Sequence, residues 1–218
     1  MSSQKNKKLI NHMIKSNSII LGKHLSESWI RDPKHLGFTL SRYKFVSKMF
    51  TDYDKVLEVG AGDGFGSRIV KDVVKKLDLT DNEILNLKFY DKKNIQSSYF
   101  IHDFCLNKLS KKYDGIYLLD VIEHIHKTKE TIFIQNIMNS LKKDGVLLIG
   151  TPSLESQKFA SETAKIGHIN CKNAMQLKTF CTKFFKRVFI FSMNDEVLHT
   201  GFHPMSHYLF AVCTTRKI

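Results

Sequence analysis

One segment, Val56 to Gly66 (VLEVGAGDGFG), constrains the fold of this chain more than any other. An apolar strand carries an acid, Glu58, close to its end, and glycines follow at positions 60, 62, 64 and 66. Glycine tolerates positive φ and lets a ligand lie against bare backbone. A helix that begins near Phe65 directs free N–H groups and the positive end of its dipole toward that ligand. The segment therefore predicts a nucleotide-like ligand at the carboxyl end of the first strand of an α/β sheet.

The spacing of these glycines distinguishes two classes of ligand. The dinucleotide fingerprint G-x-G-x-x-G serves a pyrophosphate, and it would need glycine where this chain has Phe65 or Ser67. The chain matches G-x-G-x-G, with Glu58 two residues before the first glycine. An anionic residue beside the turn disfavours a pyrophosphate and suits a ligand with hydroxyl and ammonium groups. The pattern therefore favours S-adenosylmethionine over a nicotinamide cofactor.

Three further segments extend this pattern, and with them the chain resembles the class I S-adenosylmethionine-dependent methyltransferases. Tyr113–Ile125 (YDGIYLLDVIEHI) is similar to the fourth strand of that family and the turn after it. Leu141–Ser153 (LKKDGVLLIGTPS) is similar to a helix end, a turn and the fifth strand, and Phe100–Phe104 (FIHDF) to the third strand closing on an acid. The resemblance covers residues 54 to 153 in order and spacing.

This resemblance implies an α/β fold with a Rossmann-like sheet of seven strands, mostly parallel, with an antiparallel last strand and helices on both faces. Residues 51–218 would form the methyltransferase domain, and residues 1–50 an N-terminal helical lid or extension in which Asp32-Pro33 interrupts the helices. We expect strands at 55–59, 77–81, 98–102, 114–120, 145–150, 187–193 and 207–213. We expect helices at 65–76, 129–142 and 173–184, and a helix or turn at 83–94.

The net charge raises the question of a nucleic-acid partner. The formal charge is +13, but only five of the 34 basic residues are arginine. Arginine is the side chain that most often binds phosphate and guanine through two hydrogen bonds. The lysines are spread along predicted helices and turns. We therefore expect a solvated basic surface and a small-molecule acceptor, with nucleic acid as a disfavoured partner.

Other features of the composition bear on the compartment. No run of 18 apolar residues is present, and the basic N-terminus lacks the apolar core of a secretory signal, so no membrane partner is expected. The four cysteines are scattered and form no C-x-x-C pair. This pattern is typical of reduced thiols in a cytoplasmic protein.

Methyl transfer from a sulfonium is an in-line displacement in which the enzyme mainly aligns and desolvates the reactants. A base is needed only if the acceptor must lose a proton. The sequence should therefore show a recognisable cofactor site and a more variable acceptor site. The resemblance implies that Glu58, Gly60, Ala61 and Gly62 surround the methionine portion of the cofactor.

The ends of the next strands supply the remaining cofactor residues that the resemblance implies. An acid after the second strand should accept hydrogen bonds from the ribose hydroxyls, and the family spacing favours Asp81 over Asp78. Asp103 stands where the family's acid accepts from the adenine amino group, and Phe104 beside it would pack on the adenine. Asp120, after the fourth strand, would contact the amino group of the cofactor, or alternatively cap the following turn.

Histidines are the main candidates for the acceptor site. His124 follows the fourth strand, where a residue in several relatives faces the transferred methyl group, and its pKa near neutrality suits a base. The alternative is that His124 braces its loop. His126 is expected to be solvated. His168 lies where relatives insert substrate-recognition loops, and His203 would line the acceptor pocket from the last connection or simply pack.

The stretch Trp29–Tyr43 mixes Trp, Arg, His and Tyr ahead of the first strand. Similar segments in the family often close over the cofactor. Arg42 would pair with the methionine carboxylate, and His35 or Tyr43 would contact the acceptor. The alternative is a surface helix whose aromatic side chains pack on the sheet.

The segment His199–His207 places three histidines at intervals of four residues, which is similar to metal-ligand spacing on a helix. Gly201 and Pro204 argue against a helix there, and no carboxylate or cysteine completes the set. We therefore predict no metal.

Together these features predict an S-adenosylmethionine-dependent methyltransferase that modifies an oxygen or nitrogen of a small polar molecule, for example a sugar. One alternative is an RNA or protein methyltransferase with a basic binding surface, whose binding would weaken steeply with salt. Another is a non-catalytic binding protein that keeps the methyltransferase fold. The glycine spacing disfavours a dehydrogenase.

Overall fold

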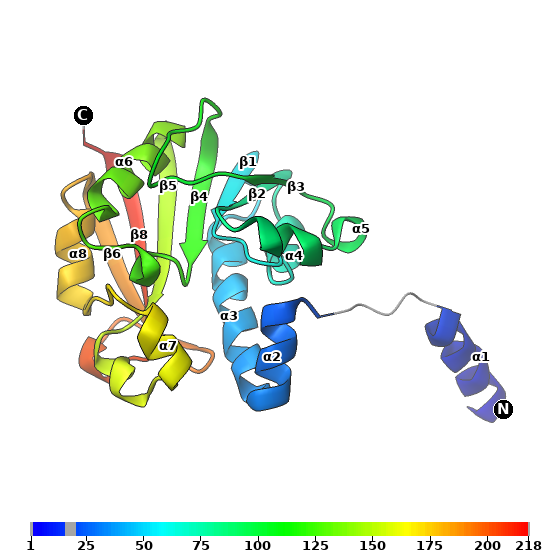
Figure 1. The fold of residues 1–218 in the computed structure, drawn as a ribbon. Coiled ribbons are helices and arrows are strands. Elements are labelled where there is room, and N and C mark those ends of the chain that lie inside the picture. Colours follow the sequence, from blue (N-terminus) through cyan, green and yellow to red (C-terminus); the bar gives the residue numbers. More distant parts are fainter. Residues whose placement is uncertain (1, 16–20, 218) are drawn as a thin grey trace.

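The computed structural model describes residues 2–15 and 21–217, which include a central sheet flanked by helices (Figure 1). Within this part of the chain the sheet has eight strands in the order β3-β2-β1-β4-β5-β8-β6-β7. The strands are β1 (Lys55–Val59), β2 (Lys76–Asp81), β3 (Ser98–Ile101), β4 (Tyr113–Leu119), β5 (Leu141–Pro152), β6 (Phe185–Asn194), β7 (Val197–His199) and β8 (Tyr208–Arg216).

Helices precede and connect these strands. The α-helices are α1 (Ser2–Lys15), α2 (Lys23–Arg31), α3 (Pro33–Met49), α4 (Ser67–Lys71), α5 (Lys92–Ile95), α6 (Glu130–Ser140), α7 (Glu162–Gly167) and α8 (Ala174–Cys181). The 3₁₀ turns are η1 (Ile84–Phe89), η2 (Ile122–His124), η3 (Glu155–Phe159) and η4 (His203–Met205). No helix in the described ranges is long and apolar enough to cross a bilayer.

The pairing of the strands confirms the predicted Rossmann-like sheet. Strands β3, β2, β1, β4 and β5 are parallel, and β8 runs antiparallel to both β5 and β6. The apolar runs of β4 and β5 are buried, as expected for parallel strands covered on both faces. Their carboxyl ends meet at one edge, and Figure 1 shows α7, α2 and the N-terminal half of α3 beyond that edge.

Two apolar cores lie on the two faces of the sheet. On one face α6 and α8 bury side chains such as Phe133 and Leu177 against the strands. On the other face α3 and α4 contribute Val46, Phe50 and Val70. Helix α3 therefore packs in the same core as the strands.

The break predicted at Asp32-Pro33 is confirmed. Helix α2 ends at Arg31, Asp32 has an extended-like backbone (φ −149°, ψ 88°), and α3 begins at Pro33. Proline fits the first turn of a helix because the missing N–H would have no intrahelical acceptor there. Of the N-terminal 50 residues predicted to form a lid, residues 1 and 16–20 lie outside the described ranges.

The structure differs from the sequence prediction in the length of two helices and in one additional strand. Helix α4 covers only Ser67–Lys71 of the predicted 65–76, because the chain turns into β2 at Lys76. The predicted helix 129–142 ends at Ser140, because Leu141 is extended and pairs with Tyr113 as the start of β5. The eighth strand, β7, lies in a connection predicted to be a loop.

Strand β7 forms because the chain reverses tightly after β6. Asn194 pairs with Val197, so only Asp195 and Glu196 form the turn between the two strands. Asp195 adopts φ +50°, the left-handed conformation that such two-residue hairpin turns require.

Candidate functional site

The loop after β1 has the backbone conformation that its glycines predict. Gly60, Gly62 and Gly64 have φ values of +75°, +57° and +76°. A Cβ on Gly60 would lie 2.3 Å from Cγ2 of Val121, so a side chain at this position is excluded by both backbone and space. The Gly60 amide donates to the Thr80 carbonyl at 2.8 Å, which ties the loop to β2.

The two candidate ribose acids on β2 have different environments. Asp81 ends the strand, and its carboxylate accepts from the amides of Gly62 (2.9 Å) and Glu83 (2.8 Å). Asp78 lies three residues earlier, is fully buried and accepts from the Tyr113 hydroxyl at 2.9 Å. The geometry therefore supports Asp81, which is beside the glycine loop. Ala61, whose amide also donates to the Thr80 carbonyl, is buried under that loop.

Glu58 is enclosed by two tyrosines. Tyr43 on α3 donates to Oε1 at 3.0 Å, and Tyr117 on β4 donates to Oε2 at 2.6 Å. Burial raises the pKa of Glu58 to about 7, and these hydrogen bonds offset only part of that rise. Tyr43, predicted as an acceptor contact, thus anchors α3 to β1. Its ring fits because Gly66 has no side chain, where a Cβ would lie 2.2 Å from the ring.

Asp103 and Phe104 follow β3 and face different surroundings. Asp103 is half-buried, and its Oδ1 accepts from the Cys105 amide at 2.7 Å. Phe104 is 1% exposed and packs edge-on against Phe133 in the core. Its ring has no exposed face on which an adenine could stack, which differs from the sequence expectation.

Arg42 and Asp120 form an ion pair with each other. Nη1 of Arg42 lies 3.0 and 2.9 Å from the two carboxylate oxygens of Asp120. The guanidinium also lies 4.0 Å from the centroid of the Tyr208 ring. Asp120 directly follows β4 and has a φ of +55°, a conformation uncommon outside glycine and a frequent feature of functional sites. The sequence predicted both residues at the methionine end of the cofactor but not their mutual contact.

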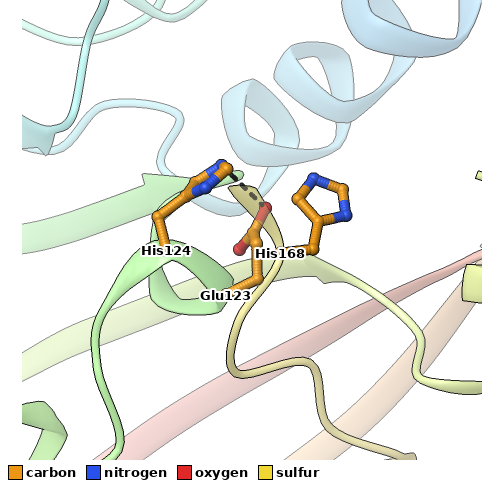
Figure 2. A group of neighbouring side chains, drawn as sticks. All are labelled: Glu123, His124 and His168. Carbon is orange, nitrogen blue, oxygen red and sulfur yellow. Dashed lines mark ion pairs between the residues drawn. The ribbon is translucent and has the colours of Figure 1, made fainter. Parts of the chain in front are cut away.

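Two histidines predicted for the acceptor site lie side by side. The rings of His124 on η2 and His168 after α7 are 5.2 Å apart between centroids. Figure 2 shows them on either side of the Glu123 carboxylate. Nδ1 of His124 lies 2.9 Å from the Gly167 carbonyl, and Nδ1 of His168 lies 2.8 Å from Oε1 of Gln157.

Glu123 is the main functional candidate that the sequence interpretation missed. Its side chain is fully buried, and Oε2 accepts from the Thr151 hydroxyl at 3.0 Å. Oε1 is buried without a hydrogen-bond partner in the described part of the chain, 3.9 Å from Nε2 of His124. Burial, followed by the negative charge of Asp120, raises the pKa of Glu123 to about 8. The sequence feature that could have identified Glu123 is the presence of an acid inside the apolar stretch VIEHI after β4.

A buried ion pair holds the loop that carries His168. Nζ of Lys172 lies 2.7 Å from Oε2 of Glu130, and the Asn170 side chain donates to the same oxygen at 2.8 Å. The Asn170 amide donates to the Glu123 carbonyl at 2.9 Å. These contacts fix the loop against η2 and bring His168 beside His124.

The other histidines are distributed more widely. Burial and then the positive charge of Arg42 lower the pKa of His35, which places this histidine in the field of the Arg42–Asp120 pair. His203 lies in η4, which packs against η3, and its Nδ1 is buried without a partner in the described structure. His126 is exposed and contacts Thr128.

Comparisons with known proteins agree with this geometry. The family model described as a methyltransferase domain matches residues 23–188. No curated protein sequence matches the chain significantly.

Solved structures share the fold at low sequence identity. They include DhpI in complex with S-adenosylhomocysteine (TM-score 0.66, 12% identity, covering 88% of this chain and 91% of that chain). The N-methyltransferase NodS from Bradyrhizobium japonicum in complex with S-adenosylhomocysteine gives a TM-score of 0.64 at 15% identity, covering 88% of this chain and 97% of NodS. The plantazolicin methyltransferase BpumL, also in complex with S-adenosylhomocysteine, gives a TM-score of 0.64 at 17% identity, covering 88% of this chain and 94% of BpumL.

The match to the family model covers well over half of the chain, and the glycine loop and the order of the strands agree with it. The chain therefore belongs to this methyltransferase-domain family, and the enzyme class and cofactor predicted from its sequence, an S-adenosylmethionine-dependent methyltransferase, are confirmed.

Proposed function

We propose that this methyltransferase transfers the methyl group to an oxygen or nitrogen of a small polar molecule, for example a sugar. The observation that carries the proposal is the pair of imidazoles, His124 and His168, beside the carboxyl end of β4. They lie with Asp120 and Arg42 at the edge of the sheet where ligands of open α/β sheets bind. These polar groups suit an acceptor that carries hydroxyl or amino groups.

The proposed cofactor site uses the edge of the sheet from β1 to β4. The backbone at Gly60 and Gly62 would lie against the methionine portion, and Asp81 would accept hydrogen bonds from the ribose hydroxyls. Asp103 would accept from the adenine amino group. Ala61 supports the loop from within the core, and Glu58 stabilises it through its two tyrosine partners rather than by contact with the cofactor.

The Arg42–Asp120 pair offers two opposite charges at the methionine end of this site. The cofactor's ammonium group would bind Asp120, and its carboxylate would bind Arg42. Binding would therefore replace one ion pair with two, without leaving either protein charge unpaired.

The chemistry requires a lone pair on the acceptor in line with the methyl–sulfur bond. As the acceptor atom bonds to the methyl carbon, the carbon–sulfur bond breaks and its electrons remain on sulfur, which leaves S-adenosylhomocysteine. His124 would take the acceptor's proton at Nε2. The Gly167 carbonyl can only accept a hydrogen bond, so Nδ1 carries the hydrogen and Nε2 the lone pair. His35, His168 and His203 would contact the acceptor.

Names of the structural relatives support an acceptor of this class. NodS is described as an N-methyltransferase and BpumL as the plantazolicin methyltransferase. An RNA or protein acceptor is the alternative because of the chain's charge of +13.

Calorimetric titration with S-adenosylmethionine, S-adenosylhomocysteine and NADH, at low and high salt, tests the cofactor site first. We expect micromolar binding of the first two and none of NADH. Asp81→Asn should weaken binding of S-adenosylhomocysteine at least tenfold, whereas Asp72→Asn, at an exposed ion pair at the end of α4, should not. An acceptor screen with sugars and amines follows, and turnover of RNA or protein alone would contradict the proposed acceptor class.

A further inference from the structure

We propose that Glu123, His124 and His168 bind a divalent cation of the first transition series. The ligands would be Oε1 of Glu123 and Nε2 of each histidine. One ligand atom from each of the three side chains already lies within 4.8 Å of the other two. Figure 2 shows that both rings flank the carboxylate, and the three residues come from two segments held together by the loop contacts of Asn170. This proposal departs from the sequence prediction that there is no metal.

Hydrogen bonding fixes the ring nitrogens that remain available. His124 donates through Nδ1 to the Gly167 carbonyl, which can only accept. The Gln157 amide nitrogen is directed at the Ser153 carbonyl at 3.1 Å, so its oxygen faces Nδ1 of His168 and accepts from it. Both rings are therefore held with a lone pair on Nε2. Metal-bound histidines characteristically donate their other nitrogen to a carbonyl in this way.

The carboxylate supplies an independent indication of a ligand. Oε2 of Glu123 is satisfied by Thr151, but Oε1 is fully buried and has no hydrogen-bond partner within the described ranges. A buried polar atom without a partner destabilises the folded state, because it has lost its hydrogen bonds to water. Oε1 is the oxygen directed at Nε2 of His124, 3.9 Å away. A cation between them would satisfy the carboxylate oxygen and both imidazole lone pairs together.

The ligand atoms, which lie up to 4.8 Å apart, must come closer together to bind one cation. Nitrogen and oxygen ligands lie about 2.0–2.2 Å from a bound transition cation, which puts them about 3–3.5 Å from each other. The 3.9 Å between Glu123 and His124 must therefore shorten by about half an ångström. The His124 side chain is 46% exposed and can tilt without disturbing the core.

The ligand set indicates both the kind of cation and its role. Imidazole nitrogens favour ions such as Zn²⁺ and Fe²⁺ over Mg²⁺ and Ca²⁺, which prefer oxygen ligands, and the Glu123 oxygen makes the set acceptable to Mn²⁺ as well. Three protein ligands leave coordination positions open, as in catalytic metal sites. The His124 side chain is 46% exposed, so the site can be reached from solvent.

A consequence follows that rests on the proposed function. A hydroxyl oxygen of the acceptor bound at an open position would lose its proton more readily, because the cation stabilises the alkoxide. The proton would pass to solvent water, and the alkoxide would attack the methyl carbon while the carbon–sulfur bond breaks. His124 would then act as a ligand, and its Nε2 would no longer be the proton acceptor.

Metal binding to the full chain tests the site without any acceptor. The protein is treated with EDTA, dialysed and titrated with Mn²⁺, Zn²⁺ and Mg²⁺ by calorimetry, and the bound metal is quantified by atomic emission. We expect one site that binds Mn²⁺ or Zn²⁺ at least tenfold more tightly than Mg²⁺. Co²⁺ loading should give a visible absorption spectrum that reports nitrogen ligands.

Variants assign the site. His168→Ala and Glu123→Gln should each weaken binding at least 100-fold, and Gln157→Ala about tenfold. His126→Ala, two residues from His124 but outside the cluster, is the matched control and should bind like the wild type. Far-UV circular dichroism and binding of S-adenosylhomocysteine show that each variant is folded.

Two results would overturn the proposal. One is a wild-type chain that binds none of these ions above the level measured in excess EDTA, and the other is His168→Ala and Glu123→Gln variants that bind as tightly as the wild type. Metal binding without S-adenosylhomocysteine binding would contradict only the proposed function, and cofactor binding without metal would contradict only this site.

Discussion

Arg42 on α3 places one nitrogen 3.0 and 2.9 Å from the two carboxylate oxygens of Asp120, and so joins α3 to the residue that follows β4. The arginine side chain is 15% exposed and also stacks on Tyr208. Arg42 is therefore held both by an ion pair and by packing on an aromatic ring, at the proposed methionine end of the cofactor site.

Replacing this arginine should weaken both stability and cofactor binding. Arg42→Ala removes the ion pair and the contact with Tyr208, and we expect a loss of about 1–2 kcal/mol of unfolding free energy. Affinity for S-adenosylmethionine should fall at least tenfold, measured by calorimetry. Arg68→Ala, at an exposed i,i+4 pair with Asp72, is the control and should cost about 0.5 kcal/mol or less. Equal effects of the two substitutions would contradict a special role for Arg42.

The glycine loop should tolerate no side chain at its first position. Gly60→Ala combines a φ of +75° with a Cβ 2.3 Å from Val121. We expect a loss of about 2 kcal/mol or more of unfolding free energy and a severe loss of cofactor binding. Gly201→Ala, which meets nothing within 4 Å, should stay within about 0.5 kcal/mol of the wild type. Denaturant unfolding measures the stability of both variants.

Glu58 should make stability depend on pH in a defined direction. Its pKa is raised to about 7 in the folded protein from 4.5, so the folded state keeps the proton that the unfolded state has already lost. The stabilisation is fully present below pH 4.5 and is lost as pH rises to 7. Across that window the unfolding free energy should fall by about 3 kcal/mol from this group. Above pH 7 the contribution should be flat.

The comparison with Glu58→Gln isolates this contribution. The substituted glutamine keeps an acceptor oxygen for one tyrosine but does not titrate, so the difference between the two unfolding curves should change by about 3 kcal/mol between about pH 4.5 and 7.5. Parallel curves for wild type and variant would show that Glu58 does not titrate in this window.

Removing one partner of the Lys172–Glu130 ion pair, which holds the loop that carries His168, should lower the unfolding free energy. Lys172→Met leaves the Glu130 carboxylate, 10% exposed, without its cation, and we expect a loss of about 2–4 kcal/mol. The double variant Lys172→Met/Glu130→Leu should recover most of that loss because no unpaired charge remains. Thermal unfolding of the wild type, Lys172→Met, Glu130→Leu and the double variant gives the coupling free energy between the two residues. A double variant no more stable than Lys172→Met would show that the loop depends on something other than this charge balance.

The fold was predictable because its signals are local. The glycines after β1, the acids at the strand ends and the apolar runs of β4 and β5 are each set by neighbouring residues. The short strand β7 was not, because its pairing depends on the left-handed conformation of a single residue, Asp195. The extension of β5 to Leu141 depends in the same way on pairing with distant Tyr113.

The candidate site was predictable in its members more than in its contacts. Arg42 and Asp120 were both assigned to the methionine end, yet 78 residues separate them and their pairing follows from the packing of α3. His124 and His168 meet because contacts of Asn170 and of the Gly167 carbonyl hold their two segments together. The direction of the Phe104 ring depends on the space left by Phe133, which no pattern in the sequence reveals.

Tyr43 and Arg42 are adjacent on α3 but reach different strands, since one hydroxyl contacts Glu58 of β1 and one guanidinium contacts Asp120 of β4. Because these two consecutive residues are bonded to different strands, the second half of α3 cannot rotate about its own axis without breaking one of the two contacts.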